Sequence, residues 1–392
     1  MLLTEAVKHP QRQRQWPQRW LWLLAGAVSI VLTGCSATDT RNDPTELTPL
    51  DLTVNASIVW RVPVGSGTTY GFAPAIVGNS VYAASRDGKV ARIDATQGAT
   101  VWNKQVTEEL SAGVGSDGET TAVVTPEGEV IALDADGEVK WRAQASSEVS
   151  VVPWVGDGVV VVRAGDYRVQ AFNAVNGERI WNVQRPGPAL ALRAPSRMNK
   201  LQGLIIAGIP GGRMLAIDPG SGAVVWEGIV AVPRGASDLE RVNDVVGTSI
   251  VRGDLLCAAA YQGRVTCFNV EEGGRTVWAN NLSSIVGLNA DDVRVYVPDN
   301  RDRVHAFELE DGDSVWFQDG LRNRQLTEPG VIGSWVVMGD LEGYVHALSG
   351  ASGELAGRLN VGGGAMLAPV QSMTDGALLQ AGDSSVVFIR LN

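Results

Sequence analysis

The chain has 392 residues, among them 46 glycines, 12 tryptophans and 3 cysteines, and its formal net charge is −11. This acidic balance argues against nucleic acid or an anionic lipid surface as the main partner. The abundance of glycine and of β-branched residues favours short strands joined by tight turns.

The first 34 residues predict a lipoprotein signal peptide. A basic stretch at 8–19 precedes the apolar run WLWLLAGAVSIVL at 20–32, which is too short to cross a membrane comfortably. The run leads into LTGC, which resembles a bacterial lipobox with cleavage before Cys35 and lipid on its thiol. Ser36 follows where an Asp would resemble an inner-membrane retention signal, so outer-membrane sorting is favoured. The alternative is a signal-anchor helix with an incidental cysteine.

Residues 35–55 are predicted to be a flexible polar tether, and residues 56–392 repeat one pattern, as in GRMLAIDPGSGAVVW at 212–226. An alternating strand leads into a turn rich in Gly, Asp and Asn, and a second strand ends in Trp. Before each unit lies another pair of strands split by a turn, as in VSVVPWVGDGVVVVRA at 149–164. Four short strands in about forty residues are typical of a β-propeller blade.

The tryptophans that end these units count the blades. They are Trp60, Trp102, Trp141, Trp181, Trp226, Trp278 and Trp316, and Gly357 occupies the eighth position. Trp60 has no partner strand before it, and residues 367–392 form a blade that lacks its Trp strand. The two deficits complement each other. The sequence therefore predicts an all-β, eight-bladed propeller of four-stranded antiparallel blades, in which the N- and C-terminal strands share one blade.

Each indole can bury its surface between neighbouring blades, so we interpret the seven tryptophans as structural. The alternative, a ligand platform, does not account for seven equivalent positions around a ring. One blade cannot bury both of its faces alone, which explains why the unit repeats until the ring closes.

Cys257 and Cys267 flank a turn on two adjacent strands, in an export compartment where disulfides persist. A cross-strand bridge is therefore sterically conceivable. Cys267, however, occupies a position that other repeats fill with alanine, such as Ala132 and Ala216. We favour two small buried thiols over a disulfide.

We expect no catalytic, cofactor or metal residues. GVGSDG at 113–118 fits a nucleotide-binding glycine pattern, but it opens into a strand and not a helix. His305 and His346 share a repeat position that elsewhere holds Gln170 or Leu215, which is not typical of a metal ligand. No GxSxG nucleophile elbow occurs.

The repeat A-x-D-x-x-x-G-x-x-x-W also resembles the blade motif of pyrroloquinoline-quinone dehydrogenases, which makes a periplasmic quinoprotein dehydrogenase the alternative function. Those enzymes commonly pair the quinone with two adjacent cysteines, a calcium site and a catalytic Asp. The present sequence has no adjacent cysteines and no evident carboxylate cluster. We therefore expect a protein that is not an enzyme.

A lipobox, a short tether and this propeller together resemble the BamB family, the propeller lipoproteins of the outer-membrane β-barrel assembly (BAM) machinery. The stretches VWRVPVGSG, VGNSVYAASRDGKV, ALALRAPS, DLERVNDVV and LEGYVHAL carry the resemblance, which covers essentially all of 56–392. It implies a monomeric, non-enzymatic scaffold, lipid-anchored in the outer membrane and facing the periplasm. Such a scaffold would bind the periplasmic domains of BamA and assist folding and insertion of outer-membrane proteins. Direct contact with unfolded substrates through strand edges is a weaker expectation, because propeller edges are short and protected.

Two connections, residues 184–194 and 228–246, exceed the regular period. Both join a Trp strand to the next blade, so they are expected side by side on one face of the ring, where binding surfaces commonly lie. Tolerated variation in loop length is the alternative. The resemblance implies that the following residues contact BamA: Leu190, Leu192, Arg193 and Asp244. Val246 stands where the family has a second acidic residue.

Overall fold

The computed structural model describes residues 42–188, 190–192 and 195–392. The predicted signal peptide and Cys35 lie outside these residues. The chain divides into the units Met1–Asp43 and Pro44–Asn392, and the second unit is described below. Within the described residues, no helix has the length and apolar character needed to span a membrane.

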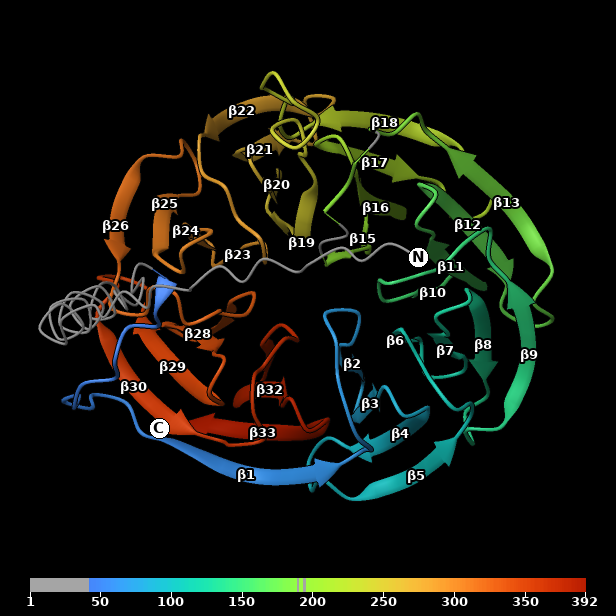
Figure 1. Cartoon of the computed structure of the whole chain (residues 1–392), viewed down its shortest axis with the longest axis horizontal. Coiled ribbons are helices and arrows are strands. Elements are labelled where there is room, and N and C mark those ends of the chain that lie inside the picture. The colour runs from blue at the N-terminus through green and yellow to red at the C-terminus, as the bar shows by residue number, and fades with distance from the viewer. Residues whose placement is uncertain (1–41, 189, 193–194) are drawn as a thin grey trace, which may run out of the picture. The chain divides into compact units, whose positions relative to one another are not determined.

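The unit Pro44–Asn392 is a ring of eight antiparallel β-sheets, as predicted (Figure 1). Seven sheets have four strands, and one carries an additional two-residue strand, β14. In each blade the first strand lies nearest the centre of the ring and the fourth lies at its rim (Figure 1). In blades 1 to 7 the four main strands pair with their neighbours in sequence, so each of these blades is a simple meander, whereas in blade 8 the fourth strand is β1.

Blades 1 to 4 consist, in order, of β2 (Ala75–Val77), β3 (Ser80–Ala84), β4 (Lys89–Asp94), β5 (Thr100–Gln105); β6 (Ala112–Ser116), β7 (Thr121–Val124), β8 (Glu129–Leu133), β9 (Val139–Gln144); β10 (Trp154–Gly156), β11 (Val159–Arg163), β12 (Arg168–Asn173), β13 (Arg179–Gln184); and β15 (Asn199–Leu201), β16 (Leu204–Ile209), β17 (Arg213–Ile217), β18 (Val224–Ile229). Blades 5 to 8 consist of β19 (Val245–Arg252), β20 (Leu255–Ala260), β21 (Val265–Asn269), β22 (Arg275–Asn280), with β14 (Ser196–Arg197); β23 (Asn289–Ala290), β24 (Arg294–Pro298), β25 (Val304–Glu308), β26 (Ser314–Gln318); β27 (Gly330–Ile332), β28 (Trp335–Gly339), β29 (Tyr344–Ser349), β30 (Leu355–Asn360); and β31 (Gln371–Met373), β32 (Gly376–Gln380), β33 (Ser385–Leu391), β1 (Ala56–Pro63).

The two ends of the ring meet in blade 8, which confirms the predicted closure. β1 pairs antiparallel with β33 and places Trp60 opposite Phe388. Beyond the strands, Asn55 N donates to Asn392 O (2.9 Å) and Asn392 N donates to Asn55 O (2.8 Å). The N-terminal strand thus becomes the outer strand of the last blade.

The core lies between the blades. Among the described residues there are eight apolar clusters, and each combines side chains from two neighbouring blades. The second and third strands of each blade supply most of the fully buried residues, as in β7 and β11, because both of their faces are covered. The fourth strands alternate between buried and exposed positions, as expected for rim strands with one free face.

The seven tryptophans connect each blade to the next. Each indole lies against a glycine of the turn between the third and fourth strands of the following blade; at Gly98, for example, a Cβ atom would lie 2.6 Å from Trp60 Cγ. Gly98 has φ +68°, so the turn itself also requires glycine. Six of the indoles also donate their N–H to a backbone carbonyl in that turn. These bonds are Trp60 to Ala95 (3.1 Å), Trp102 to Ala135 (2.9 Å), Trp141 to Ala174 (3.0 Å), Trp181 to Pro219 (2.8 Å), Trp278 to Leu309 (2.9 Å) and Trp316 to Gly350 (3.0 Å).

The ring closure explains why Gly357 replaces the eighth tryptophan. A tryptophan at position 357 would have to pack against the connection between the third and fourth strands of blade 8. That place is occupied by the segment before β1 and by the end of the chain at Asn392. Val54 lies there and is buried, and a Cβ on Gly357 would approach Val54 Cγ1 to 2.6 Å. Thr53 N and Val54 N both donate to Ala356 O (2.9 and 3.2 Å).

The predicted tether is therefore shorter than expected, because residues 44–55 are bound to the ring. Arg324, only 2% exposed, donates to Thr45 O (2.8 Å) while its Nε donates to Asp340 Oδ2 (2.8 Å). Arg358 Nη1 donates to Thr48 O (2.8 Å). The sequence shows no periodicity in this segment, so its attachment could not be predicted.

Cys257 and Cys267 form a disulfide, so the favoured interpretation as two free thiols was wrong. They lie directly opposite each other on β20 and β21, with their Cα atoms 4.1 Å apart, and both are fully buried. Cys267 does occupy the small-residue position opposite a tryptophan, Trp278, as its alanine counterparts do. The facing position on β20 supplies the second sulfur.

Candidate partner-binding loops

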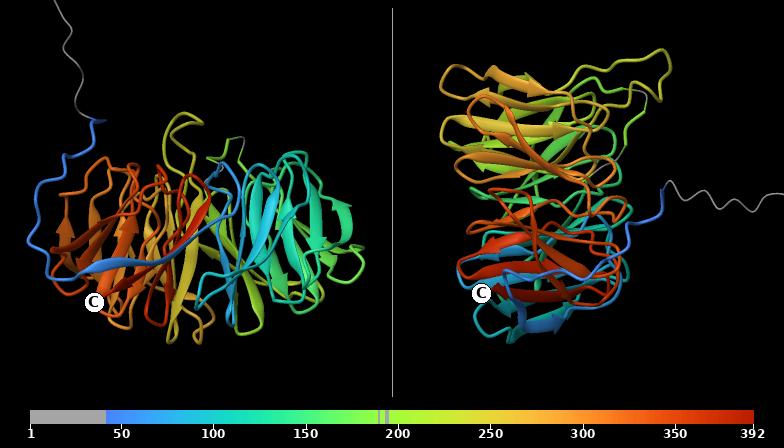
Figure 2. Two further views of the ribbon diagram at one scale, coloured as in Figure 1. Left: turned by 90° about the horizontal axis from the view of Figure 1, so that it is seen from below. Right: turned by 90° about the vertical axis from the view of Figure 1, so that its left-hand side faces the viewer.

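Two long loops rise from one end of the ring, which we call the loop face. The first loop (residues 185–195) follows β13, and the second loop (residues 230–244) joins β18 to β19. The left view of Figure 2 shows both above the ring, in light green and yellow. All connections from a fourth strand to the next blade reach this face, because the strands of each blade alternate in direction.

The first loop differs from the expected connection because it bypasses its own next blade. It leads into β14, which pairs parallel with β19 of blade 5 before the chain returns to blade 4 at β15. Gly247 N donates to Pro195 O (2.6 Å) at the start of this pairing. The end of the first loop is thereby attached to the strand that follows the second loop.

Asp244, at the end of the second loop, is hydrogen-bonded to the first loop. It is only 4% exposed, and its Oδ2 accepts a hydrogen bond from Leu192 N (2.5 Å). Its Oδ1 accepts from Gly211 N (3.4 Å), and its main-chain carbonyl accepts from Tyr261 N (2.8 Å). Burial raises the pKa of Asp244, while the bonds from Leu192 and Gly211 and the charge of Arg163 oppose that rise. The carboxylate is directed at loop backbone and not at solvent.

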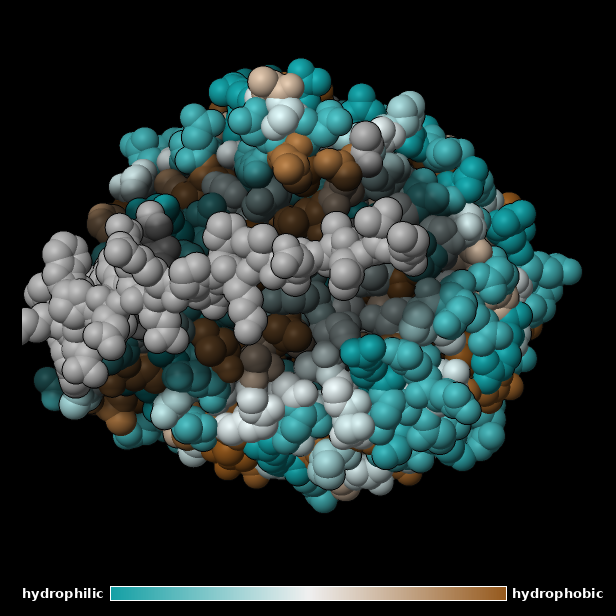
Figure 3. Space-filling model, in the orientation of Figure 1, coloured by the Kyte–Doolittle hydropathy of each residue, from teal (hydrophilic) through white to brown (hydrophobic). Residues whose placement is uncertain are grey.

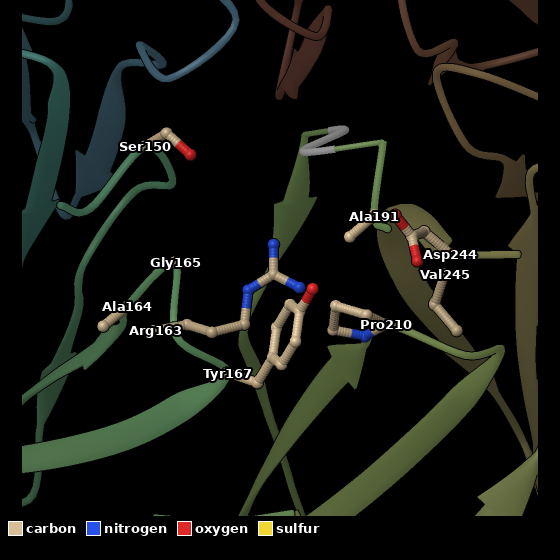
Figure 4. Close-up of a pocket in the computed structure, with 9 residues that line it drawn as sticks. All are labelled: Ser150, Arg163, Ala164, Gly165, Tyr167, Ala191, Pro210, Asp244 and Val245. Atoms are coloured by element: carbon tan, nitrogen blue, oxygen red, sulfur yellow. The ribbon is translucent and has the colours of Figure 1, made fainter. Parts of the chain in front are cut away.

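Arg163 and Tyr167 of blade 3 line the same small cavity as Asp244 (Figure 4). Arg163 Nη1 donates to Gly208 O (2.9 Å); burial lowers the pKa of Arg163, and the Asp244 carboxylate opposes that shift. Tyr167 adopts a left-handed backbone conformation (φ 69°), and its hydroxyl donates to Pro188 O (3.1 Å). The cavity between these side chains measures about 30 Å³, room for one or two water molecules and no larger ligand.

The loops expose apolar side chains toward solvent. Leu190 is 44% exposed and Leu192 is 39% exposed, and the second loop adds Val232 and Leu239 at 52% and 72%. In Figure 3, hydrophobic residues gather on this face beside the two loops. Isolated exposed apolar residues are ordinary, but four on two loops tied together are typical of a contact surface.

The predicted site residues differ in their burial. Leu190 and Leu192 lie on the exposed first loop, Asp244 is buried beneath it, and Arg193 lies outside the described residues. Val246 is 1% exposed and packs between blades 5 and 6. Sequence reasoning missed Val232 and Leu239, although apolar residues in a long polar loop were an available signal. It also missed Arg163 and Tyr167, whose role depends on a loop from another blade.

Each described histidine lies close to an aspartate of the turn that precedes its own strand. His346 is buried and its Nε2 lies 2.8 Å from Asp340 Oδ2, while His305 Nε2 lies 3.2 Å from Asp299 Oδ2. Within the described ranges, no group of three His, Cys, Asp or Glu side chains could hold a metal ion.

The centre of the ring does not fit the donor set of a quinone dehydrogenase. The central cavity of about 380 Å³ has one carboxylate, Glu328, in its described lining, whereas calcium takes about six to eight oxygen ligands, several of them carboxylates. The two cysteines are ten residues apart and bonded within blade 5, so the adjacent pair of such enzymes is missing.

Comparison with known proteins agrees with this geometry. Residues 46–111 and 86–318 match the family model described as "Outer membrane protein assembly factor BamB". The protein of that name from Bordetella pertussis is 52% identical over 366 residues, which cover 93% of this chain and 95% of its own length. The chain belongs to the BamB family. The crystal structure of BamB from Moraxella catarrhalis has a TM-score of 0.79 at 25% identity and covers 86% of this chain and 100% of its own.

The BamB family shares its ring with enzymes only at the level of the fold. Quinohemoprotein alcohol dehydrogenase from Comamonas testosteroni has a TM-score of 0.66 at 14% identity and covers 86% of this chain and 76% of its own. This likeness is one of fold alone. It carries no activity to the present chain, because the fold supports unrelated functions.

Proposed function

We propose that this protein is a non-catalytic scaffold of the outer-membrane β-barrel assembly machinery that binds the periplasmic domains of BamA through its two long loops. Lipid on Cys35 anchors it in the outer membrane, facing the periplasm. The observation that carries the proposal is the pair of loops joined by Asp244, which display four exposed apolar side chains on one face of a rigid ring. Membership of a family named for outer-membrane protein assembly supports the role.

The chemistry of the loops suits recognition of another protein. Leu190 and Leu192 are two residues apart and both exposed, so they can form one apolar anchor. Arg193 follows them, and a guanidinium can donate several hydrogen bonds to a carboxylate or to carbonyl groups of the partner. Asp244 is buried beneath the first loop, where its carboxylate holds Leu192 in place. The exposed residues of the loops, and not Asp244, contact the partner.

Co-purification from detergent-solubilised outer membranes tests the proposal. The double variant Leu190→Ala/Leu192→Ala should lose most of the BamA that wild type retains, with an unchanged melting temperature. Val175→Ala is the matched control, because Val175 is 76% exposed in a turn on the opposite face of the ring. Normal BamA recovery with the leucine variant, or equal loss with the control, would refute the assigned face.

A further inference from the structure

One turn departs from the repeat at the interface of blades 4 and 5. In the turn between β17 and β18, Gly222 N donates to Asp218 O (2.9 Å), four residues earlier. In the turn between β21 and β22, Gly274 N donates to Asn269 O (2.8 Å), five residues earlier. This turn contains one additional residue, and both Gly273 and Gly274 have positive φ angles, +71° and +78°.

The additional residue displaces Trp226, whose indole should pack on this turn. In the equivalent contact, the atom nearest to a Cβ on Gly222 is Trp181 Cγ. On Gly274 the nearest atom is Trp226 Nε1, so the indole presents its N–H edge to the turn and not its face. No described residue accepts a hydrogen bond from this N–H, although the other six tryptophans of the series all bond to the next blade.

The acceptor that the repeat would provide is the carbonyl of Val270. Val270 follows Asn269 as Pro219 follows Asp218, and Pro219 O accepts the N–H of Trp181 (2.8 Å). At this turn the Trp226 N–H therefore does not bond to the carbonyl that the repeat would provide, and Trp226 and Val270 both line one cavity.

An apolar cavity of about 210 Å³ lies at this opening. Its lining includes Leu201, Leu204, Ile206, Trp226, Leu256 and Val270. An apolar cavity of about 150 Å³ is large enough for benzene, so this one can hold a branched aliphatic or an aromatic side chain. It lies beside the turns β15–β16 and β21–β22, at the end of the blades opposite the loop face.

We propose that this cavity is a binding site for a polypeptide segment, which inserts one large apolar side chain. The peptide carbonyl next to that side chain accepts the N–H of Trp226, and the peptide N–H donates to Val270 O. An amide is the group that provides one acceptor and one donor side by side, which is why the site favours a peptide over a hydrocarbon. The inference is independent of the proposed BamA contact, which lies on the other face.

Titration with N-acetyl-L-phenylalaninamide, followed through the indole N–H signals of ¹⁵N-labelled protein, tests the site. We expect a saturable shift of the Trp226 signal, assigned with Trp226→Phe, at a dissociation constant on the order of 1 mM. Trp181 is the internal control, because its turn has the regular length and its N–H is bonded. Toluene, which has no amide, should move the Trp226 signal far less.

Deletion of Gly273 restores the regular turn and should close the cavity. The shift on adding N-acetyl-L-phenylalaninamide should then disappear. Leu201→Asp provides a second variant that keeps the turn but makes the lining polar, and it should weaken binding at least tenfold. The proposal is overturned if wild type shows no saturable shift, if Trp181 shifts as much as Trp226, or if toluene acts as strongly as the amide.

Discussion

Removal of the Asp244 carboxylate should release the first loop from the second. In Asp244→Ala, Leu192 N loses its acceptor at 2.5 Å, and Gly211 N loses a weak one at 3.4 Å. A hydrogen bond to a charged group contributes about 1.5–3 kcal/mol, and the cost of burying the carboxylate offsets part of it. We therefore expect a net loss of about 1–2 kcal/mol, which makes opening of the loop roughly five- to thirtyfold more frequent.

Hydrogen exchange measured by mass spectrometry on peptides covering residues 185–195 tests this prediction. Exchange at Leu192 should accelerate by that factor in Asp244→Ala, while the core strands of blades 3 to 5 keep their protection. Asp238→Ala is the matched control, because Asp238 is an exposed aspartate of the second loop. Unchanged exchange at Leu192 in Asp244→Ala would show that the carboxylate does not hold the loop.

Three further predictions concern the ring and its anchor. Trp60→Ala should cost about 3–5 kcal/mol of unfolding free energy, and deletion of 384–392 should cost at least as much because it opens the ring; an unchanged melting temperature would contradict the closure. Cys35→Ala should release folded protein into the periplasm, and full retention in salt-washed membranes would contradict lipid anchoring. Burial raises the pKa of Asp340, but hydrogen bonds from His346 and from a backbone N–H outweigh it and leave that pKa below its ordinary value. Asp340 therefore stabilises the fold above pH about 4 and loses this effect as the pH falls further. Asp340→Asn should lower the melting temperature at neutral pH and flatten its dependence on pH below about pH 4; an equally steep dependence would refute this role.

The ring could be predicted because its interactions repeat. Each Trp and each turn glycine recur at a nearly constant spacing, and the unmatched strand at Trp60 complements the unmatched blade at the C-terminus. These features follow from local periodicity, which a sequence displays directly. The eight blades and their closure were therefore predictable in full.

The exceptions to the repeat were not predictable, because each depends on residues that meet only in three dimensions. Val54 fills the position left by Gly357, and Arg324 reaches Thr45 across about 280 residues of sequence. Cys257 faces Cys267 in register, which a preference for alanine at the second position concealed.

The candidate site was predicted in part. The lengths of the two connections and the leucines of the first loop were visible in the sequence. The burial of Asp244 was not, because it depends on β14 crossing to blade 5 and on Arg163 from blade 3. An acidic residue in a loop looks exposed until its backbone partners are known.

The affinity of the purified protein for the periplasmic domains of BamA tests the central claim most directly, when wild type is compared with Arg193→Ala. A hot-spot arginine contributes about 2 kcal/mol or more, so the dissociation constant should rise at least about thirtyfold, with a melting temperature that stays within a few degrees. Arg179→Ala, at an exposed position on the outer strand β13, should bind as wild type does. Equal affinity of wild type and Arg193→Ala would contradict the account.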